Sequence, residues 1–138
     1  MKEVWTNIQL VIAGLGGWLG WFLGGYDGFL FALIAFVVLD YLLGVMCAFV
    51  EKHVSSEIGA RGIFKKVVIF TLVAIAQIVD KNIIGNGGAI RTAVIFFYLS
   101  NEGISIIENA TRLGLPIPKK LCDVLEQLKD GGDKDKRK

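Results

Sequence analysis

The sequence predicts an all-α membrane protein with four transmembrane helices and a short C-terminal cytosolic amphipathic helix. Hydrophobic residues make up 54% of the 138 residues, and the mean hydropathy is +0.57. Soluble domains contain about 45–50% apolar residues. The apolar residues fall in separate runs, each close to the roughly 20 residues that a helix needs to cross a bilayer. We therefore predict a transmembrane domain over 1–115, followed over 116–138 by the amphipathic helix and a disordered basic tail.

The first two helices are predicted over 4–23 and 29–50, and the turn "GGYDG" between them predicts a hairpin. Gly16, Gly20 and Gly24 are four residues apart and would form a groove along one face of the first helix. Such a groove lets two backbones approach closely in lipid. It would serve either the hairpin within one chain or the association of copies.

The third and fourth helices are predicted over 63–79 and 89–110. The third ends before the turn-forming "GNGG". The fourth ends at "GLPIP", because Pro116 and Pro118 lack amide donors and restrict the residues before them. An alternative arrangement has three transmembrane helices, with the fourth segment lying in the membrane interface.

Basic residues in short loops predict the orientation, because such residues are retained on the cytoplasmic side. The first turn has none, whereas the second link and the tail are rich in them. Alternation of four helices then leaves both termini in the cytoplasm. The basic residues expected at the inner membrane surface are Lys52, Arg61, Lys65, Lys66, Lys119 and Lys120.

Asp40 lies in the middle of the second predicted helix, with small neighbours that include Gly44. An acidic residue within a membrane is a candidate functional residue. It is equally a candidate for a hydrogen bond between helices or for an ion pair with Lys65 or Lys66, because polar side chains also hold membrane helices together. We expect Gly44 to contribute to helix packing.

The fourth helix carries a polar stripe, since residues three or four apart share one face of a helix. A spanning helix with one polar face is typical of a pore lining or of a seam between copies. The other interpretation is a helix in the interface, with its polar face among headgroups. In a single chain we expect Glu102 and Glu108 to be hidden against the second helix or near Lys65 and Lys66. The residues predicted to line the pore are Tyr98, Asn101, Glu102, Ser105, Glu108 and Asn109.

The tail contains a short amphipathic helix, because Leu121, Val124, Leu125 and Leu128 follow an i, i+3, i+4, i+7 pattern. This helix would lie on the inner leaflet or associate with its copies. The final "GGDKDKRK" is predicted to be disordered.

No catalytic or metal-binding pattern is present in the sequence. The single His53 lies in a polar link, and Cys47 and Cys122 have no partner at metal-ligand spacing. The net charge of +2, without a basic aromatic stripe, gives no support for nucleic-acid binding. We therefore expect a non-enzyme without cofactor or metal, whose partners are its own copies and membrane lipids.

Three stretches resemble the toxin-secretion and phage-lysis holin family of Gram-positive bacteria and their phages. They are "LDYLLGVMCAFVEKHVSSEIGARGIFKKV", "IIGNGGAIRTAVIFFYLSNEGISIIENATRLGLPIPKKL" and "DVLEQLK". The similarity covers residues 40–129. It is most specific at Asp40, Tyr41, Gly44, Asn101, Glu102, Ser105, Glu108, Asn109, Leu113, Gly114, Pro116 and Pro118.

This resemblance implies a small protein of the bacterial cytoplasmic membrane that oligomerises and opens lesions at a set time. Through such lesions a cell-wall hydrolase, or in some relatives a large toxin, leaves the cell. The alternative function is that of a helical membrane scaffold or transporter subunit without lytic activity, whose acidic residues pair within one folded chain.

Overall fold

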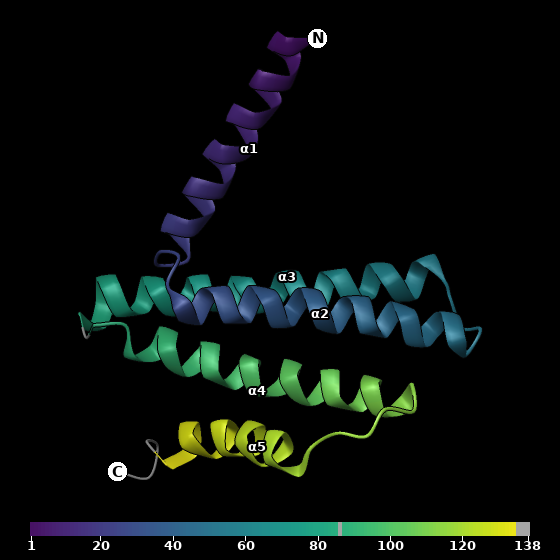
Figure 1. Ribbon diagram of the computed structural model, residues 1–138. Coiled ribbons are helices and arrows are strands. Elements are labelled where there is room, and N and C mark those ends of the chain that lie inside the picture. The colour runs from purple at the N-terminus through teal and green to yellow at the C-terminus, as the bar shows by residue number, and fades with distance from the viewer. Residues whose placement is uncertain (86, 135–138) are drawn as a thin grey trace.

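The computed structural model describes residues 1–85 and 87–134, with side chains described as far as Gln127. Every regular element in these ranges is helical, as Figure 1 shows. The elements are α1 (Lys2–Phe22), α2 (Gly28–Val50), α3 (Ser56–Val79), a π-helical turn η1 (Asp80–Ile84), α4 (Ala89–Arg112) and α5 (Lys119–Lys134).

The starts of α2, α3 and α4 are capped by side chains that accept hydrogen bonds from free backbone amides. Asp27 accepts from the amide of Leu30 at 2.8 Å, and Ser55 accepts from the amide of Ile58 at 3.1 Å. The cap of α4 is supplied from a distance by Asp80 of η1, whose carboxylate accepts from the first-turn amides of α4. The position where α4 starts is therefore tied to the end of α3.

The end of α4 is closed by a glycine turn. Gly114 adopts a left-handed backbone with φ +90°, a conformation that favours glycine. The amides of Gly114 and Leu115 return to the carbonyl oxygens of Thr111 and Ala110 at 2.9 and 3.1 Å. The chain then reverses, and α5 lies along α4.

The core is formed where α2, α3 and α4 pack together. Leu30 and Leu33 of α2, Val73 of α3 and Ile95 of α4 are fully buried there. Figure 1 shows α4 between the α2–α3 pair and α5. The side chains of α4 therefore meet protein on two faces.

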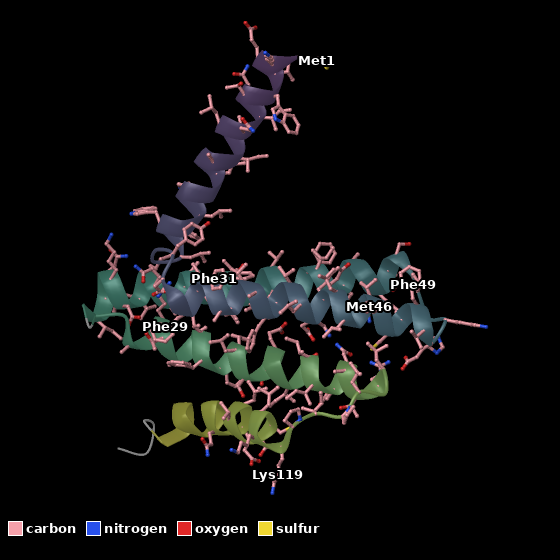
Figure 2. All side chains as sticks on the ribbon, viewed as in Figure 1. Met1, Phe29, Phe31, Met46, Phe49 and Lys119 are labelled. Carbon is pink, nitrogen blue, oxygen red and sulfur yellow. The ribbon has the colours of Figure 1, made fainter. Side chains whose placement is uncertain are left out.

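Helix α1 projects away from the bundle, as Figure 1 shows, so the predicted hairpin of the first two helices is wrong. Among the described residues, α1 packs along no other helix. Its side chains stand clear of the bundle in Figure 2. The face of α1 that carries Gly16 and Gly20 is instead contacted by the turn residue Tyr26, which folds back onto α1.

The glycine row of α1 does not form a helix-packing groove within the chain. Gly24 lies beyond the end of α1 with φ +95°, so only Gly16 and Gly20 are helical. The ring of Tyr26 lies so close to Gly20 that a Cβ there would meet Cε2 at 2.3 Å. The Tyr26 hydroxyl donates to the carbonyl of Gly16 at 2.8 Å. These two glycines hold an aromatic side chain, and their role between copies stays a prediction.

Three helices are long and apolar enough to cross a membrane in the described part of the chain: α2, α3 continued through η1, and α4. Helix α1 is absent from this group because Thr6, Asn7, Gln9 and its glycines lower its hydropathy. The chain is thus an all-α protein with three candidate spans. A fourth span over α1 stays a prediction.

Two helix boundaries differ from the predicted ones. Helix α3 begins at Ser56 rather than at residue 63, because Ser55 supplies a cap and the ring of Tyr41 packs over Gly59 and Gly62. Helix α5 continues to Lys134, although disorder was predicted from Gly131. A helix tolerates glycine at a modest energetic cost, so the pair at 131–132 does not stop it. The remainder of that prediction, over 135–138, lies outside the described residues.

Candidate functional site

The interior of the bundle contains an ionic cluster built from three helices. The ammonium group of Lys66 on α3 forms ion pairs with Asp40 of α2 and with Glu102 of α4. The amide of Asn109 on α4 donates to the other oxygen of Asp40 at 3.3 Å. We call Asp40, Lys66, Glu102 and Asn109 the Lys66 cluster. It joins the three helices that are candidates to span a membrane.

The Lys66 cluster lies near the middle of these helices. At a rise of 1.5 Å per residue, Asp40 is roughly 18 Å from the first residue of α2, and Glu102 is roughly 20 Å from the first residue of α4. The side chains of Asp40 and Glu102 are each 9% exposed, and that of Lys66 is 17% exposed. If the bundle crosses a bilayer, the cluster lies deep in the hydrocarbon layer.

The cluster holds two carboxylates and one ammonium group. Lys66 directs one N–H to each carboxylate, and a buried ion pair is tolerated when such hydrogen bonds accompany it. When all three groups are ionised, negative charge exceeds positive charge by one. One negative charge of the cluster is therefore not balanced by Lys66, and water or a donor on another chain would stabilise it.

The surface position predicted for Lys66 is wrong, because its side chain points into the bundle. Since α3 begins earlier than predicted, Lys66 lies well inside the helix rather than near its start. Its neighbour Lys65 is exposed. The ion pair of Asp40 with one of these two lysines, considered from the sequence, is thus formed by Lys66 alone. The other basic residues of that prediction are exposed: Lys52, Arg61, Lys119 and Lys120.

The polar stripe of α4 is divided between two environments. Glu102 and Asn109 are buried against α2 and α3, whereas Glu108 is exposed. The prediction that Glu102 is hidden near Lys66 is confirmed. The same prediction for Glu108 is wrong, because packing of α4 leaves the Glu108 side chain exposed. The remaining residues of the stripe are partly buried: Tyr98, Asn101 and Ser105.

Gly44 lies where α2 approaches α4, as expected for a packing residue. A Cβ at this position would contact the Asn109 amide nitrogen at 3.8 Å. One turn later on α2, the thiol of Cys47 donates to the backbone carbonyl of Asn109 at 3.3 Å. Asn109 is therefore held from both its side chain and its backbone, and it can support Asp40 in a fixed orientation.

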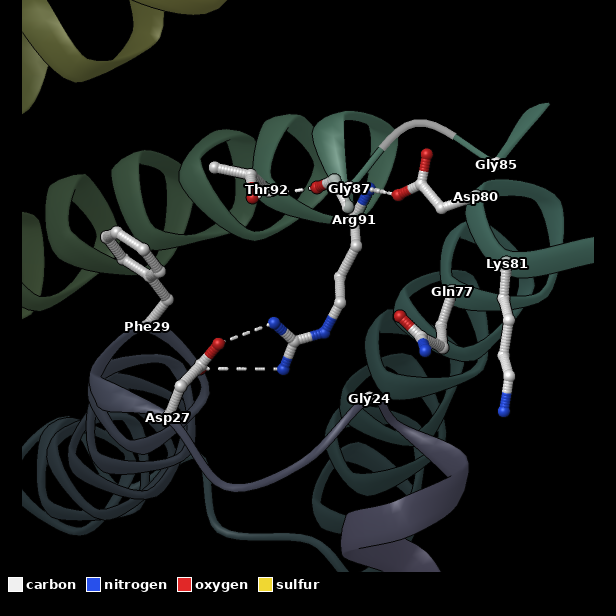
Figure 3. A pocket seen from close by; sticks show the side chains of 11 residues that line it. Gly24, Asp27, Phe29, Gln77, Asp80, Lys81, Gly85, Gly87, Arg91 and Thr92 are labelled. Carbon is white, nitrogen blue, oxygen red and sulfur yellow. Dashed lines mark hydrogen bonds and ion pairs between the residues drawn. The ribbon is translucent and has the colours of Figure 1, made fainter.

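A second ionic site lies at the end of the bundle where α2 and α4 begin. The guanidinium group of Arg91 donates to the Asp27 carboxylate at 2.7 Å and to the carbonyls of Leu23 and Gly25 at 2.6 and 3.0 Å. Asp80 accepts from the backbone amide of Arg91 at 2.7 Å. Figure 3 shows Arg91, Asp27 and Asp80 lining a pocket. The volume of this pocket is about 590 Å³. We call this site, made by Arg91, Asp27, Asp80 and the 23–25 backbone, the Arg91 clamp.

The Arg91 clamp depends on the backbone of the turn and on one partly exposed carboxylate. A Cβ on Gly24 would come within 2.5 Å of the Arg91 Nε atom, so only glycine leaves room for the guanidinium group. The hydrogen bond from Arg91 holds the pKa of Asp27 below its usual value. Sequence patterns did not predict this site. Its only local signal was an aspartate before a helix, which is also the signal of an ordinary cap.

In the described part of the chain, no group of three or more His, Cys, Asp or Glu side chains is placed to hold a metal ion. The Lys66 cluster and the Arg91 clamp are ion-pair networks. The clamp fastens a turn, and the cluster joins the three candidate spans.

The sequence profile of the bacteriophage holin family matches residues 17–130. The chain belongs to this family. The match begins inside α1 and ends inside α5, so it includes both ionic sites. Membership agrees with the three apolar helices, and together they identify a membrane protein with the character of a holin.

Several relatives match nearly the full length of the chain. An uncharacterised 14.9 kDa protein of Clostridium perfringens, from the nagH 3′ region, is 40% identical over 128 residues, which are 93% of this chain and 97% of the relative. An uncharacterised protein of Listeria monocytogenes is 40% identical over 131 residues, which are 94% and 93% of the two chains. One from Bacillus subtilis is 29% identical, covering 83% and 81%. No solved structure matches the chain.

Proposed function

We propose that the chain is a holin that accumulates in the bacterial cytoplasmic membrane, oligomerises and opens lesions. A cell-wall hydrolase, or a large toxin, leaves the cell through these lesions, and the chain itself performs no catalysis. The observation that carries the proposal is the ion pair of Glu102 with Lys66 in the middle of the candidate spans. Family membership supports the same function.

The Lys66 cluster supplies a physical basis for two states. A charged side chain at the centre of a lone membrane helix costs about 2.5–3.5 kcal/mol. In a single chain Lys66 offsets this cost for Glu102. In an assembly, water or a neighbouring α4 takes over that role, and the polar stripe of α4 lines the lesion. Binding between copies then shifts the population towards the state with the exposed stripe.

The proposed topology has α2, α3 with η1, and α4 crossing the membrane, with α5 in the cytoplasm. The basic link before and within the start of α3 lies on the cytoplasmic side. We keep α1 as a fourth crossing, because its exposed apolar side chains need lipid or another apolar surface. With four crossings, the N-terminus lies in the cytoplasm. An epitope placed before Met1 tests this topology, because an external protease removes it from intact cells if α1 remains on the outer face.

The function is tested by inducing the chain in a bacterium together with a wall hydrolase, while membrane potential and hydrolase release are recorded. We expect an abrupt loss of potential followed by release. The Glu102→Gln variant should release at an altered time, because an amide keeps a polar group but loses the ion pair. The Glu102→Leu variant should release late or not at all, because the polar lining is lost.

The matched control is Glu57→Gln, which removes an exposed carboxylate in the first turn of α3 whose ion pair with Arg61 is solvated. This variant should release on the unaltered schedule. All variants are compared at equal membrane levels. Unchanged growth and potential at high levels of the unaltered chain would exclude the holin and favour the scaffold or transporter subunit.

A further inference from the structure

Helix α5 is docked against α4 at the depth of the candidate spans. Leu125 is 5% exposed, and a Cβ on Gly103 would come within 2.7 Å of its Cδ2 atom. The hydroxyl of the fully buried Ser100 donates to the carbonyl of Leu125 at 2.7 Å. Ser100 lies roughly 16 Å from the first residue of α4. The docking site is thus near the middle of α4, at about the depth of the Lys66 cluster.

The outer surface of docked α5 is charged. Lys119, Lys120, Asp123 and Glu126 are all exposed while Leu125 is buried. Charged side chains at bilayer depth are strongly unfavourable unless they meet water or a partner. If α4 crosses a bilayer, the side of the bundle that carries docked α5 must therefore face water rather than lipid.

In the docked position part of the apolar row of α5 stays exposed, which leaves α5 a competing location. Leu121 and Val124 belong to the same apolar row as Leu125, yet they stay 47% and 52% exposed in the docked position. An amphipathic helix on a leaflet buries such a row together. In the connection between α4 and α5, the Leu115 side chain is exposed and nothing lies within 4 Å of a Cβ on Gly114, so side-chain packing does not hold this turn.

We propose that α5 occupies two positions. When α4 faces lipid, α5 lies on the inner leaflet with its whole apolar row buried. In the assembled lesion α5 folds back onto Ser100 and Gly103, and its charged surface lines the water-filled lumen beside the stripe of α4. The proposal rests on the proposed function, and it adds a second lining element supplied by every copy.

Disulfide trapping tests the position of α5. Gly103→Cys and Leu125→Cys are introduced together with Cys122→Ser, since the Gly103 Cβ position lies against Leu125. The matched control pair is Gly103→Cys with Val124→Cys, because the Val124 side chain is half exposed. Cells are oxidised with copper phenanthroline before and after the loss of membrane potential, and the disulfide within the chain is quantified by mass spectrometry.

We expect at least a tenfold rise on release in the disulfide that joins positions 103 and 125, and little change in the control pair. An equal yield before and after the loss of potential would overturn the proposal, because α5 would then be docked while α4 faces lipid. Absence of the disulfide after hydrolase release would overturn it as well. Either of these two results would leave the holin function standing. If the unaltered chain released no hydrolase, both the holin function and the two positions of α5 would be overturned.

A pair of single substitutions keeps the test independent of the cysteines. Leu125→Ser removes the docking contact, whereas Val124→Ser weakens only the apolar row. Leaflet binding uses both residues, whereas docking buries Leu125 and leaves Val124 half exposed. We therefore expect Leu125→Ser to delay hydrolase release clearly more than Val124→Ser at equal membrane levels. Equal delays would overturn the docked position.

Discussion

The Arg91 clamp and the Lys66 cluster both join helices through a cation, but they differ in how completely the charges are satisfied. Arg91 directs its donors to one carboxylate and two carbonyls, and the Asp27 side chain is 44% exposed to solvent. Lys66 stands between two carboxylates that are each 9% exposed. The clamp fixes the turn before α2 to the start of α4 at the end of the bundle. The cluster holds one more acidic group than basic groups in the middle of the bundle.

Under the proposed function, this difference indicates that the Lys66 cluster rearranges and the Arg91 clamp does not. Every polar group of the clamp has a partner from the turn or from the start of α4, so rearrangement would only lose hydrogen bonds. In the cluster, if one carboxylate moves away from Lys66, the other carboxylate still forms an ion pair with it. Four sets of variants test the contrast, each measured by thermal unfolding of the protein in detergent unless stated otherwise.

The largest effect is expected from Lys66→Met. It leaves Asp40 and Glu102 buried without a cation, and breaking a buried pair in this way costs about 3–5 kcal/mol. The control Lys65→Met removes the exposed neighbouring charge and should change the unfolding free energy by about 0.5 kcal/mol or less. Equal effects of the two variants would show that Lys66 does not carry the interaction between the three helices.

Gly24→Ala should be the next most destabilising change. The new methyl group would meet Arg91 Nε at 2.5 Å and Gln77 Oε1 at 2.6 Å, on a backbone with φ +95°. Gly25→Ala is a matched control, because its φ is +96° and nothing lies within 4 Å of the new Cβ. We expect about 1–2 kcal/mol for Gly25→Ala from backbone strain, and about 1–3 kcal/mol more for Gly24→Ala from the collision. Equal losses of unfolding free energy in the two variants would mean that Arg91 and Gln77 accommodate the added methyl group without cost.

Arg91→Lys should cost about 2 kcal/mol, because one ammonium group cannot serve Asp27 and both carbonyls, and hydrogen bonds to charged groups contribute about 1.5–3 kcal/mol. Chymotrypsin should also cleave after Tyr26 more readily in this variant. The control is Arg112→Lys, whose partner Glu51 is solvent-accessible, and where the expected change is below about 1 kcal/mol. A stable Arg91→Lys protein with a protected turn would contradict the clamp.

The smallest effect is the pH dependence of the clamp. The hydrogen bond from Arg91 lowers the pKa of Asp27 in the folded chain. The resulting stabilisation is present above the unfolded value of about 3.9 and is lost as pH falls through the lower folded value. The difference in melting temperature between the unaltered chain and Asp27→Asn should therefore be constant from pH 7 to 5 and shrink towards pH 2. A difference that does not shrink would exclude the ion pair as its cause.

Most helices were predictable from the sequence, because a helix is encoded by its own residues. The long apolar runs located α1, α2 and α4 within about two residues at each end. Helix α3 was predicted too short, since the Ser55 cap and the packing of Tyr41 outweighed a polar local composition. Asp40 was recognised as needing a partner, because a lone carboxylate in an apolar run cannot remain unpaired.

Tertiary structure decided which partner each charge has. Asp40 and Lys66 are 26 residues apart, and Arg91 and Asp27 are 64 apart, so both pairs depend on how whole helices are rotated against one another. Periodicity placed Glu102, Glu108 and Asn109 on one stripe, but only packing turned the first and third inward and left the second exposed. The departure of α1 from the bundle was likewise not readable from its apolar run, because it depends on the turn, where Tyr26 packs on Gly20 and donates to the Gly16 carbonyl. Local sequence sets the helical face that a residue occupies, and the neighbouring helices determine what that face meets.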